Sequence, residues 1–408
     1  MKSMLERFPR PDWVRRINAM GDSVGGAENM VSLDVDELIG LASKSTGLED
    51  FGETIDGDWR GRLTHLVAAL EGSARLNVVG RLMARQEILR SLRSRLFLAK
   101  ALNDNPAIRK ETILEPIIVT GSARSGTSIL LELLGQDPRA RAPIAFEALH
   151  AGSPNSDPEA LRAMTECEQE LWADVVPEFS AIHELRADLP DECVVLQKPS
   201  FGGMFWWILN RLDNWIPDLE AAMQYHKAVL QVLQYGQQKK TWVLKTPFYL
   251  SMLDLLFEVY PDAYIVLTHR DPVKTVPSGL STLAAARWQR SDYDCLEEIF
   301  GMTATAMIDT MVDVHRRRKK GELPDRFVDL HFSDLMSSPV ETIKRAYEQM
   351  GRPFAPDHEV AILHYLSEKP KGKFGKHIYT PEDWGFDSEA LRIHSKPYMA
   401  CYGVKPEE

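Results

Sequence analysis

The sequence has few cysteines, no long apolar run and no excess of basic residues. Its four cysteines lie far apart and form no Cys-x-x-Cys pair, which argues against a disulfide framework and against a zinc site. No uninterrupted apolar stretch approaches the roughly 18 residues that a membrane-spanning helix needs. Residues 1–20 carry charges throughout and lack the apolar core of a secretory signal. We therefore expect a cytoplasmic protein with no transmembrane segment.

The charge balance also excludes classes of partner. The 408 residues include 48 Lys and Arg against 59 Asp and Glu, a net charge of −11, which argues against nucleic acid as a partner. At 44% hydrophobic residues, the chain is long enough to bury a large core in one large domain or two smaller ones. An acidic exterior of this kind is compatible with a local basic pocket for an anionic ligand.

A strand, a glycine-bounded loop and a helix are predicted between Pro116 and Leu134. The apolar residues 117–120 run into Gly121, and an amphipathic segment follows Ser128. Gly121 and Gly126 let the backbone turn so that amide hydrogens and the helix N-terminus face one anion. The pattern predicts a phosphate-binding loop; the alternative is a purely structural glycine turn.

The loop lacks parts that an ATP- or GTP-binding loop requires. Thr127 stands after the second glycine, where such loops have lysine, and Arg124 is the cation inside the loop. Ser128 has a hydroxyl suited to magnesium, but no apolar strand ends in an aspartate that must serve as its partner. We therefore expect no metal.

Two more strands are predicted to end in cations. The apolar run 263–268 leads to Arg270, and Asp271-Pro272 then opens a helix. Ser278 follows Arg270 by eight residues, about two helical turns, so both side chains are expected to face one ligand. The run 241–244 ends in Lys245. Since ligands of open α/β sheets collect at the carboxyl edge, Arg124, Lys245 and Arg270 are expected to meet there.

With these motifs the sequence resembles the sulfotransferases that use 3′-phosphoadenosine 5′-phosphosulfate (PAPS), particularly their bacterial branch. The resemblance runs from about Pro116 to the C-terminus. It implies a three-layer α/β/α fold with a central parallel sheet, like that of P-loop NTPases. It further implies transfer of a sulfuryl group from PAPS to a hydroxyl, or less readily an amine, of a small acceptor.

The resemblance assigns the donor site residue by residue. The 5′-phosphosulfate would be held by the loop Arg124, Ser125, Gly126, Thr127 and Ser128. The 3′-phosphate would be held by Arg270 and Ser278. Lys245 resembles a family lysine that reaches the leaving oxygen or the sulfonate.

The general base is less directly marked. The cytosolic family members have a histidine two residues after the lysine, but Pro247 stands at that position here. Golgi-type members place a catalytic glutamate at about the distance of Glu147, so we expect Glu147 to be the base, with its pKa raised by partial burial. The alternative is a surface glutamate at a loop–helix junction. His183 is then the second candidate base, although a lone histidine is more often structural.

Two further segments resemble parts of the family's nucleotide site. Phe332 stands where the family has a tyrosine that contacts the adenine, and it would stack without donating a hydrogen bond. A core phenylalanine is the alternative. Lys371, Gly372 and Lys373 form a basic loop that would close over the 3′-phosphate; the alternative is a solvated loop.

We expect the chain to divide into a helical region, residues 1–110, and a domain that resembles the sulfotransferases, residues 111–408. Helices are predicted over 34–45 and 74–102 from apolar residues at helical spacing. This region is expected to pack on the core, to cover the acceptor pocket or to form a homodimer contact. The aromatic residues 205–207 are expected to line an apolar pocket for a hydrophobic, hydroxylated acceptor such as a sterol, lipid or phenol.

Two other functions remain open from sequence. A P-loop kinase acting on a small molecule would bind ATP with magnesium, so Mg-ATP would stabilise it more than the product 3′-phosphoadenosine 5′-phosphate (PAP). A non-catalytic nucleotide-binding protein would bind PAP but would transfer sulfate to no acceptor.

Overall fold

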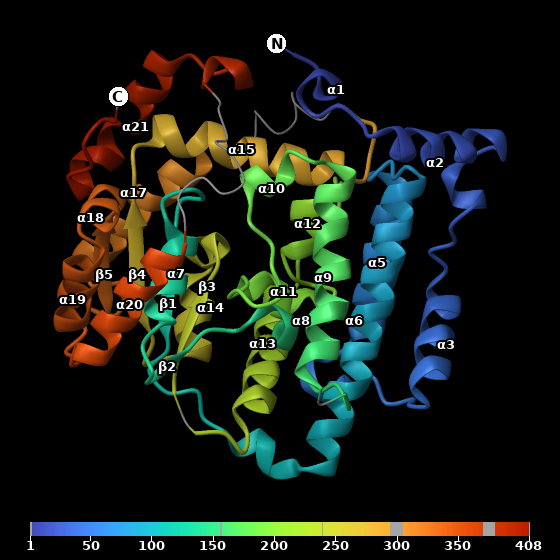
Figure 1. Ribbon diagram of the computed structural model, residues 1–408, viewed down its shortest axis with the longest axis horizontal. Helices are drawn as coiled ribbons and strands as arrows, with labels where there is room; N and C mark the ends of the chain where they lie inside the picture. Colours follow the sequence, from blue (N-terminus) through green and yellow to red (C-terminus); the bar gives the residue numbers. More distant parts are fainter. Residues whose placement is uncertain (1, 156, 239, 294–304, 370–379, 408) are drawn as a thin grey trace.

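The fold is built on a sheet of five parallel strands in the order β2-β3-β1-β4-β5, which lies to one side of the N-terminal helices (Figure 1). A computed structural model describes the chain except for residues 1, 156, 239, 294–304, 370–379 and 408. The strands are β1 (Ile117–Gly121), β2 (Ala140–Arg141), β3 (Thr241–Lys245), β4 (Tyr264–His269) and β5 (Phe327–His331). The strand order reverses at β1, which lies between β3 and β4. Open α/β sheets bind ligands beside the carboxyl ends of the strands at such a reversal.

The three central strands are the three that the apolar runs predict. Every residue of β1 is buried, and so are all but the first residues of β3 and β4. Strands covered by helices on both faces need such continuous apolar runs. Alternate residues of β1 enter different cores: Ile118 packs on one face, and Ile117 and Val119 pack on the other.

Helices cover both faces of the sheet, which confirms the predicted three-layer α/β/α fold. The core around Ile117 and Val119 includes residues of α7 (Thr127–Leu134), α19 (Pro339–Gln349) and α20 (Pro356–Glu368). The core around Ile118 includes residues of α13 (Leu219–Gln234), α14 (Leu253–Val259), α17 (Ala306–Lys319) and α21 (Ser388–Tyr402).

The N-terminal residues form helices that share a core with later residues, between Val175 and Trp288 and at Trp384. These helices are α1 (Met4–Arg7), α2 (Asp12–Ser23), α3 (Val35–Thr46), α4 (Glu53–Asp56), α5 (Trp59–Gly72) and α6 (Val78–Asp104). The predicted cap at Asp34 and stop at Gly47 are both present. The long helix begins at Val78, later than the apolar spacing predicts, because the Asn77 side chain caps it by accepting from the Gly80 amide at 2.8 Å.

Helix α15 (Pro272–Trp288) connects the sheet edge to the N-terminal helices. It begins as predicted, with Asp271 as its N-cap and Pro272 in its first turn. Its far end packs in the N-terminal core, where the Trp288 indole donates to the Phe8 carbonyl at 2.9 Å. The middle of the chain adds α8 (Ala145–Leu149), α9 (Pro158–Val175), α10 (Phe179–Ile182), α11 (Cys193–Gln197) and α12 (Phe205–Leu209), and α18 (Phe332–Ser337) follows β5.

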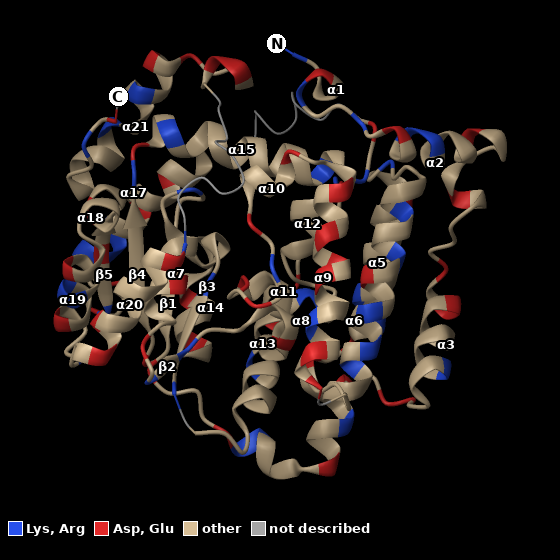
Figure 2. Cartoon of the chain, viewed as in Figure 1, with Lys and Arg blue, Asp and Glu red and all other residues tan. Residues whose placement is uncertain are grey.

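Charged residues of both signs lie on the outer helices, whereas the strands are largely uncharged (Figure 2). Within the described residues, no helix has the length and apolar character needed to cross a bilayer. The cations that the sequence assigns to a ligand site, Arg124, Lys245 and Arg270, lie at or just after the carboxyl ends of β1, β3 and β4.

Candidate active site

The loop after β1 has the shape of an anion cradle. Gly121 and Gly126 have φ angles of +143° and +92°, and Arg124 also has a positive φ of +69°. A Cβ atom at position 126 would lie 2.8 Å from Cδ2 of Phe332, so only glycine fits there. The Ser125 hydroxyl donates to the Ser122 carbonyl at 2.6 Å, which holds the turn. Helix α7 then starts at Thr127, so its N-terminus faces the loop.

Residues predicted to bind the sulfate donor PAPS contact one another. Arg124 Nε donates to Ser278 Oγ at 3.1 Å, and Arg270 Nη1 donates to the Arg124 carbonyl at 3.1 Å. The Arg270 guanidinium lies over the Phe332 ring, 3.9 Å from its centroid. Arg124 therefore bridges Arg270 and Ser278, which approach the site from the end of β4 and from the second turn of α15.

One cavity of about 730 Å³ contains all three predicted cations, Arg124, Lys245 and Arg270, in its lining. Of the other predicted donor residues, Gly126, Thr127, Ser128 and Phe332 also line it. Ser125 and Ser278 are fully buried and are not among the described residues that line the cavity. Lys371, Gly372 and Lys373 lie outside the described residues.

A cluster of ionisable residues adjoins the loop. Lys245, the last residue of β3, is buried and forms an ion pair with Oε1 of Glu192, the N-cap of α11. Nε2 of His183 lies 3.8 Å from that same oxygen. Arg124 Nη1 donates to the Ile182 carbonyl at 2.8 Å, so the segment that carries His183 is attached to the anion loop. All three ionisable residues line the cavity.

The Glu192 carboxyl is held ionised. Burial alone would raise its pKa, but the positive charge of Lys245 and the His183 imidazole outweigh burial and lower the pKa to about 2. The neighbouring Asp191 is largely buried, and burial raises its pKa. The pKa values of these adjacent carboxyls thus shift in opposite directions, because of the two only Glu192 pairs directly with a cation.

Glu147 lies elsewhere. It is on the short helix α8, beside the edge strand β2, and its carboxylate accepts from Arg141 Nη2 at 2.9 Å. The Arg141 guanidinium in turn lies over the Trp242 ring at 4.8 Å. Among the described residues of α8, Leu149 lines the cavity and Glu147 does not. The structure therefore does not bring Glu147 together with Arg124, Lys245 and His183.

The remaining wall of the cavity is mostly apolar. Phe205 and Trp207 line it, whereas Trp206 is buried in the core, where its indole donates to the Lys198 carbonyl at 3.1 Å. Further lining residues of apolar character are Trp172, Phe179, Leu185, Val195, Leu280 and Leu283. Such a wall suits a hydrophobic ligand whose polar end meets the ionisable cluster.

The C-terminal segment contacts the donor residues. The Glu407 carboxylate accepts three hydrogen bonds from Arg270, two from Nε at 2.9 and 3.2 Å and one from Nη2 at 3.0 Å. The Glu407 amide donates to Asp271 Oδ2 at 2.8 Å, and Arg392 pairs with that same oxygen at 3.0 Å. A carboxylate thus binds the arginine that the sequence assigns to the 3′-phosphate.

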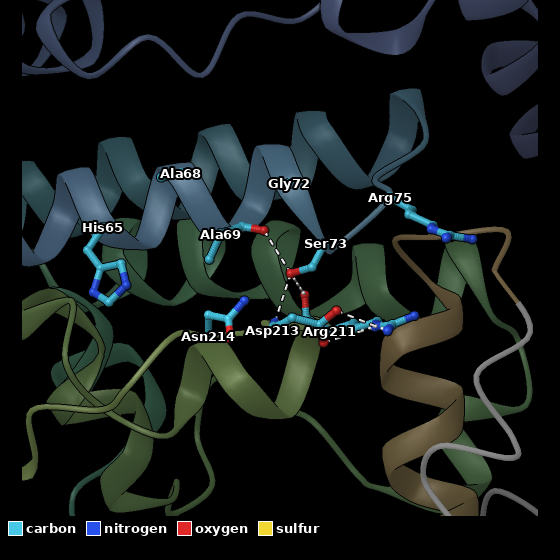
Figure 3. A pocket seen from close by; sticks show the side chains of 9 residues that line it. All are labelled: His65, Ala68, Ala69, Gly72, Ser73, Arg75, Arg211, Asp213 and Asn214. Atoms are coloured by element: carbon cyan, nitrogen blue, oxygen red, sulfur yellow. Dashed lines mark hydrogen bonds and ion pairs between the residues drawn. The ribbon is translucent and has the colours of Figure 1, made fainter.

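A smaller pocket of about 440 Å³ lies between α5 and residues 211–214 (Figure 3). Its polar groups bond one another: the Ser73 hydroxyl donates to the Arg211 carbonyl at 3.2 Å and accepts from the Asp213 amide at 2.8 Å. It has neither the cations nor the anion loop of the larger cavity. Across the described ranges, no cluster of three or more His, Cys, Asp and Glu has the arrangement of a metal site.

Comparisons with known proteins agree with this geometry. The profile of the sulfotransferase family matches residues 116–356. Omega-hydroxy-beta-dihydromenaquinone-9 sulfotransferase Stf3, from Mycobacterium bovis and from Mycobacterium tuberculosis, is 26% identical over 302 residues, covering 67% of this chain and 72% of the relative.

Two crystal structures of sulfotransferases superpose over most of the chain. STF9 of Mycobacterium avium has a TM-score of 0.77 and 26% identity, covering 91% of this chain and 97% of that one. STF1 of Mycobacterium tuberculosis has a TM-score of 0.73 and 26% identity, covering 89% and 98%. The likeness thus includes the N-terminal helices, beyond the segment that the family profile matches.

Proposed function

Because this chain belongs to the sulfotransferase family, we propose that it transfers the sulfuryl group of PAPS to a hydroxyl of a hydrophobic small molecule. The observation that carries the proposal is the direct contact of Arg124 with both Ser278 and Arg270 beside a glycine-bounded helix N-terminus. Such a site offers hydrogen-bond donors of the loop and of Arg124 for the phosphosulfate of PAPS, and a second arginine, Arg270, for its 3′-phosphate.

The reaction needs charge stabilisation and one proton acceptor. The acceptor oxygen forms a bond to sulfur, the bond from sulfur to the bridging oxygen breaks, and its electron pair stays on the 5′-phosphate of PAP. By analogy with phosphoryl transfer, positive groups at the bridging oxygen lower the barrier. Arg124 and Lys245 are the proposed sources of that charge.

His183 is the proposed base, in preference to Glu147. It lines the cavity one residue after the carbonyl that Arg124 binds, whereas Glu147 is paired with Arg141 beside β2. Histidine is also the side chain whose ordinary titration range is nearest to neutral pH, which suits a general base. The ionised Glu192 beside it would stabilise the imidazolium that forms.

The acceptor is proposed to be a long or flat apolar molecule with a hydroxyl. Two observations support this: the wall formed by residues such as Trp172, Phe205 and Trp207, and the name of the relative Stf3, which acts on a hydroxylated menaquinone lipid. A hydroxylated isoprenoid quinone and a long-chain alcohol are therefore the first acceptors to offer.

Calorimetry with PAP tests the donor site, and transfer of labelled sulfate from PAPS to those alcohols tests the reaction. We expect PAP to bind in the micromolar range or tighter without added magnesium, and to raise the unfolding temperature more than Mg-ATP does. A larger effect of Mg-ATP would support a kinase instead. Binding of PAP with no transfer to any alcohol, phenol or sterol would support a non-catalytic nucleotide-binding protein.

Paired variants test the base. His183→Gln is expected to lower turnover by about 10²–10⁴-fold while PAP binds as before, because general bases contribute on this scale. Glu147→Gln, with the same loss of one titratable group, is expected to retain most activity. The reverse pattern would return the role of base to Glu147.

A further inference from the structure

One carboxylate oxygen of Glu192 faces two positively charged or chargeable groups. Its Oε1 pairs with the Lys245 ammonium and lies 3.8 Å from His183 Nε2. The three side chains come from three separate elements: the end of β3, the N-cap of α11 and the residue after α10. Such sharing places the carboxylate between the proposed source of charge and the proposed base.

The backbone fixes this arrangement from both sides. The Glu192 amide donates to Asp191 Oδ1 at 2.7 Å, and the Asp191 amide donates to the Pro143 carbonyl at 2.9 Å. The His183 amide donates to the Phe179 carbonyl at 2.8 Å, and its ring stacks on that phenylalanine with centroids 6.4 Å apart. A site held in this way needs little rearrangement when charge develops.

The charges around His183 are arranged unequally. Glu192 and Asp191 lie near it just before α11, Lys245 pairs from β3 with the same Glu192 oxygen, and Arg124 binds the carbonyl that precedes it. With a pKa of about 2, Glu192 stays ionised at every pH at which the protein would work. It is therefore a weak proton acceptor but a strong partner for a cation.

We propose that Glu192 is a positioning residue whose carboxylate changes partner from Lys245 to His183 during sulfuryl transfer, an inference that rests on the proposed function. As the acceptor oxygen bonds to sulfur, its proton moves to the imidazole of His183. The carboxylate then pairs with the imidazolium, and the Lys245 ammonium neutralises the charge that grows on the bridging oxygen. Proton uptake and stabilisation of the leaving group are thereby coupled through one oxygen atom.

The test compares the pH profiles of two variants with opposite expected shifts. In Glu192→Gln, turnover is expected to fall by about 10–100-fold, and the acidic limb of kcat/KM is expected to move to lower pH by about one unit, because the imidazolium loses its counter-charge. In Lys245→Met, turnover also falls, but the limb is expected to move to higher pH, because the carboxylate then interacts with His183 alone and stabilises the imidazolium more strongly. Glu192→Asp keeps the charge and should restore part of the activity with the limb near its original position.

The matched control is Glu184→Gln. Glu184 is close in sequence to His183 and pairs with Lys369 at 3.2 Å, with a side chain about as exposed as that of Glu192 (22% against 20%). It is not among the described residues that line the cavity, so its replacement should leave both turnover and the limb unchanged.

Each outcome supports or overturns the inference. Loss of activity with an unmoved limb in both variants, or a limb that moves the same way in both, would leave Glu192 a purely structural residue. Wild-type turnover in Glu192→Gln would also overturn it. If that variant does not fold, a limb that moves to higher pH in Lys245→Met and stays near its original position in Glu192→Asp supports the inference, and an unmoved limb in Lys245→Met overturns it. The proposed function fails separately, through absent PAP binding or absent transfer by the unaltered protein.

Discussion

Replacing Glu407 by glutamine is expected to strengthen the binding of PAP. In the structure this carboxylate makes three hydrogen bonds of 2.9–3.2 Å to Arg270, the residue assigned to the 3′-phosphate. A phosphate that binds Arg270 must displace the carboxylate, because both need the same guanidinium donors. The free energy of the Arg270–Glu407 pair is therefore subtracted from the binding free energy of the nucleotide.

The size of the effect follows from the exposure of the pair. Fully exposed ion pairs contribute about 0–1 kcal/mol, and bidentate, partly buried pairs contribute more. The side chains of Arg270 and Glu407 are 19% and 33% exposed, so we assign the pair about 1–1.5 kcal/mol. Loss of the competing charge should then lower the Kd of PAP by about 5–12-fold.

Isothermal titration with PAP at low ionic strength measures this change directly. Glu389→Gln, which removes the same charge from the first turn of α21, is the matched control and should bind PAP like the unaltered protein. In an Arg270→Ala background, where PAP binding itself is expected to weaken by about 2–4 kcal/mol, Glu407→Gln should have no further effect. Equal affinities of Glu407→Gln and the unaltered protein would refute the idea that the two anions compete.

Two more predictions concern the loop and the core. Gly126→Ala should weaken PAP binding at least about tenfold, because its Cβ would lie 2.8 Å from the Phe332 ring at a φ of +92°. Gly321→Ala is the control, since Gly321 also has a positive φ but has open space around it. Equal PAP binding by both variants would contradict the steric argument. Lys198→Met should stabilise the fold by about 1–3 kcal/mol, because Lys198 is buried with no hydrogen-bond partner for its Nζ among the described residues. Burial, and after it the nearby charge of Arg90, lower the pKa of Lys198. Between that lowered pKa and about 10.4, the unfolded chain therefore binds more protons than the folded one. The free energy of unfolding should rise with pH in this window. Urea unfolding at about pH 7 and pH 9 should show that rise for the unaltered protein and a smaller one for the variant; no gain in stability at neutral pH would count against the reasoning.

The central strands could be predicted because buried parallel strands need continuous apolar residues. The runs at 117–120, 241–244 and 263–268 all became strands of the sheet. The edge strand β2 has only two residues, so no periodicity marks it. Helix α6 starts later than the apolar spacing from Ala74 predicts, because the Asn77 side chain caps it through a local hydrogen bond.

The loop that we propose binds the sulfate donor could also be recognised from sequence, since its glycines and the predicted cations follow strands that end at one edge of the sheet. Glu192 could not be found in this way: it follows Pro190-Asp191 in a loop, and nothing local separates it from many other acidic residues. Glu147, in contrast, stands at a spacing that favours a catalytic role, yet packing pairs it with Arg141, the last residue of the edge strand β2. Sequence distance is a poor guide to such residues because helices of variable length separate them.

Local sequence is enough to predict the glycine-bounded loop, the cations that end three strands, and the eight-residue step from Arg270 to Ser278, because backbone turns and helical pitch depend on neighbouring residues alone. The carboxylates that meet those cations are set by packing between distant segments. Glu192 reaches Lys245 across 53 positions and Glu407 reaches Arg270 across 137. Electrostatic interactions depend on distance in space and on burial, and both are fixed only when the distant segments pack together.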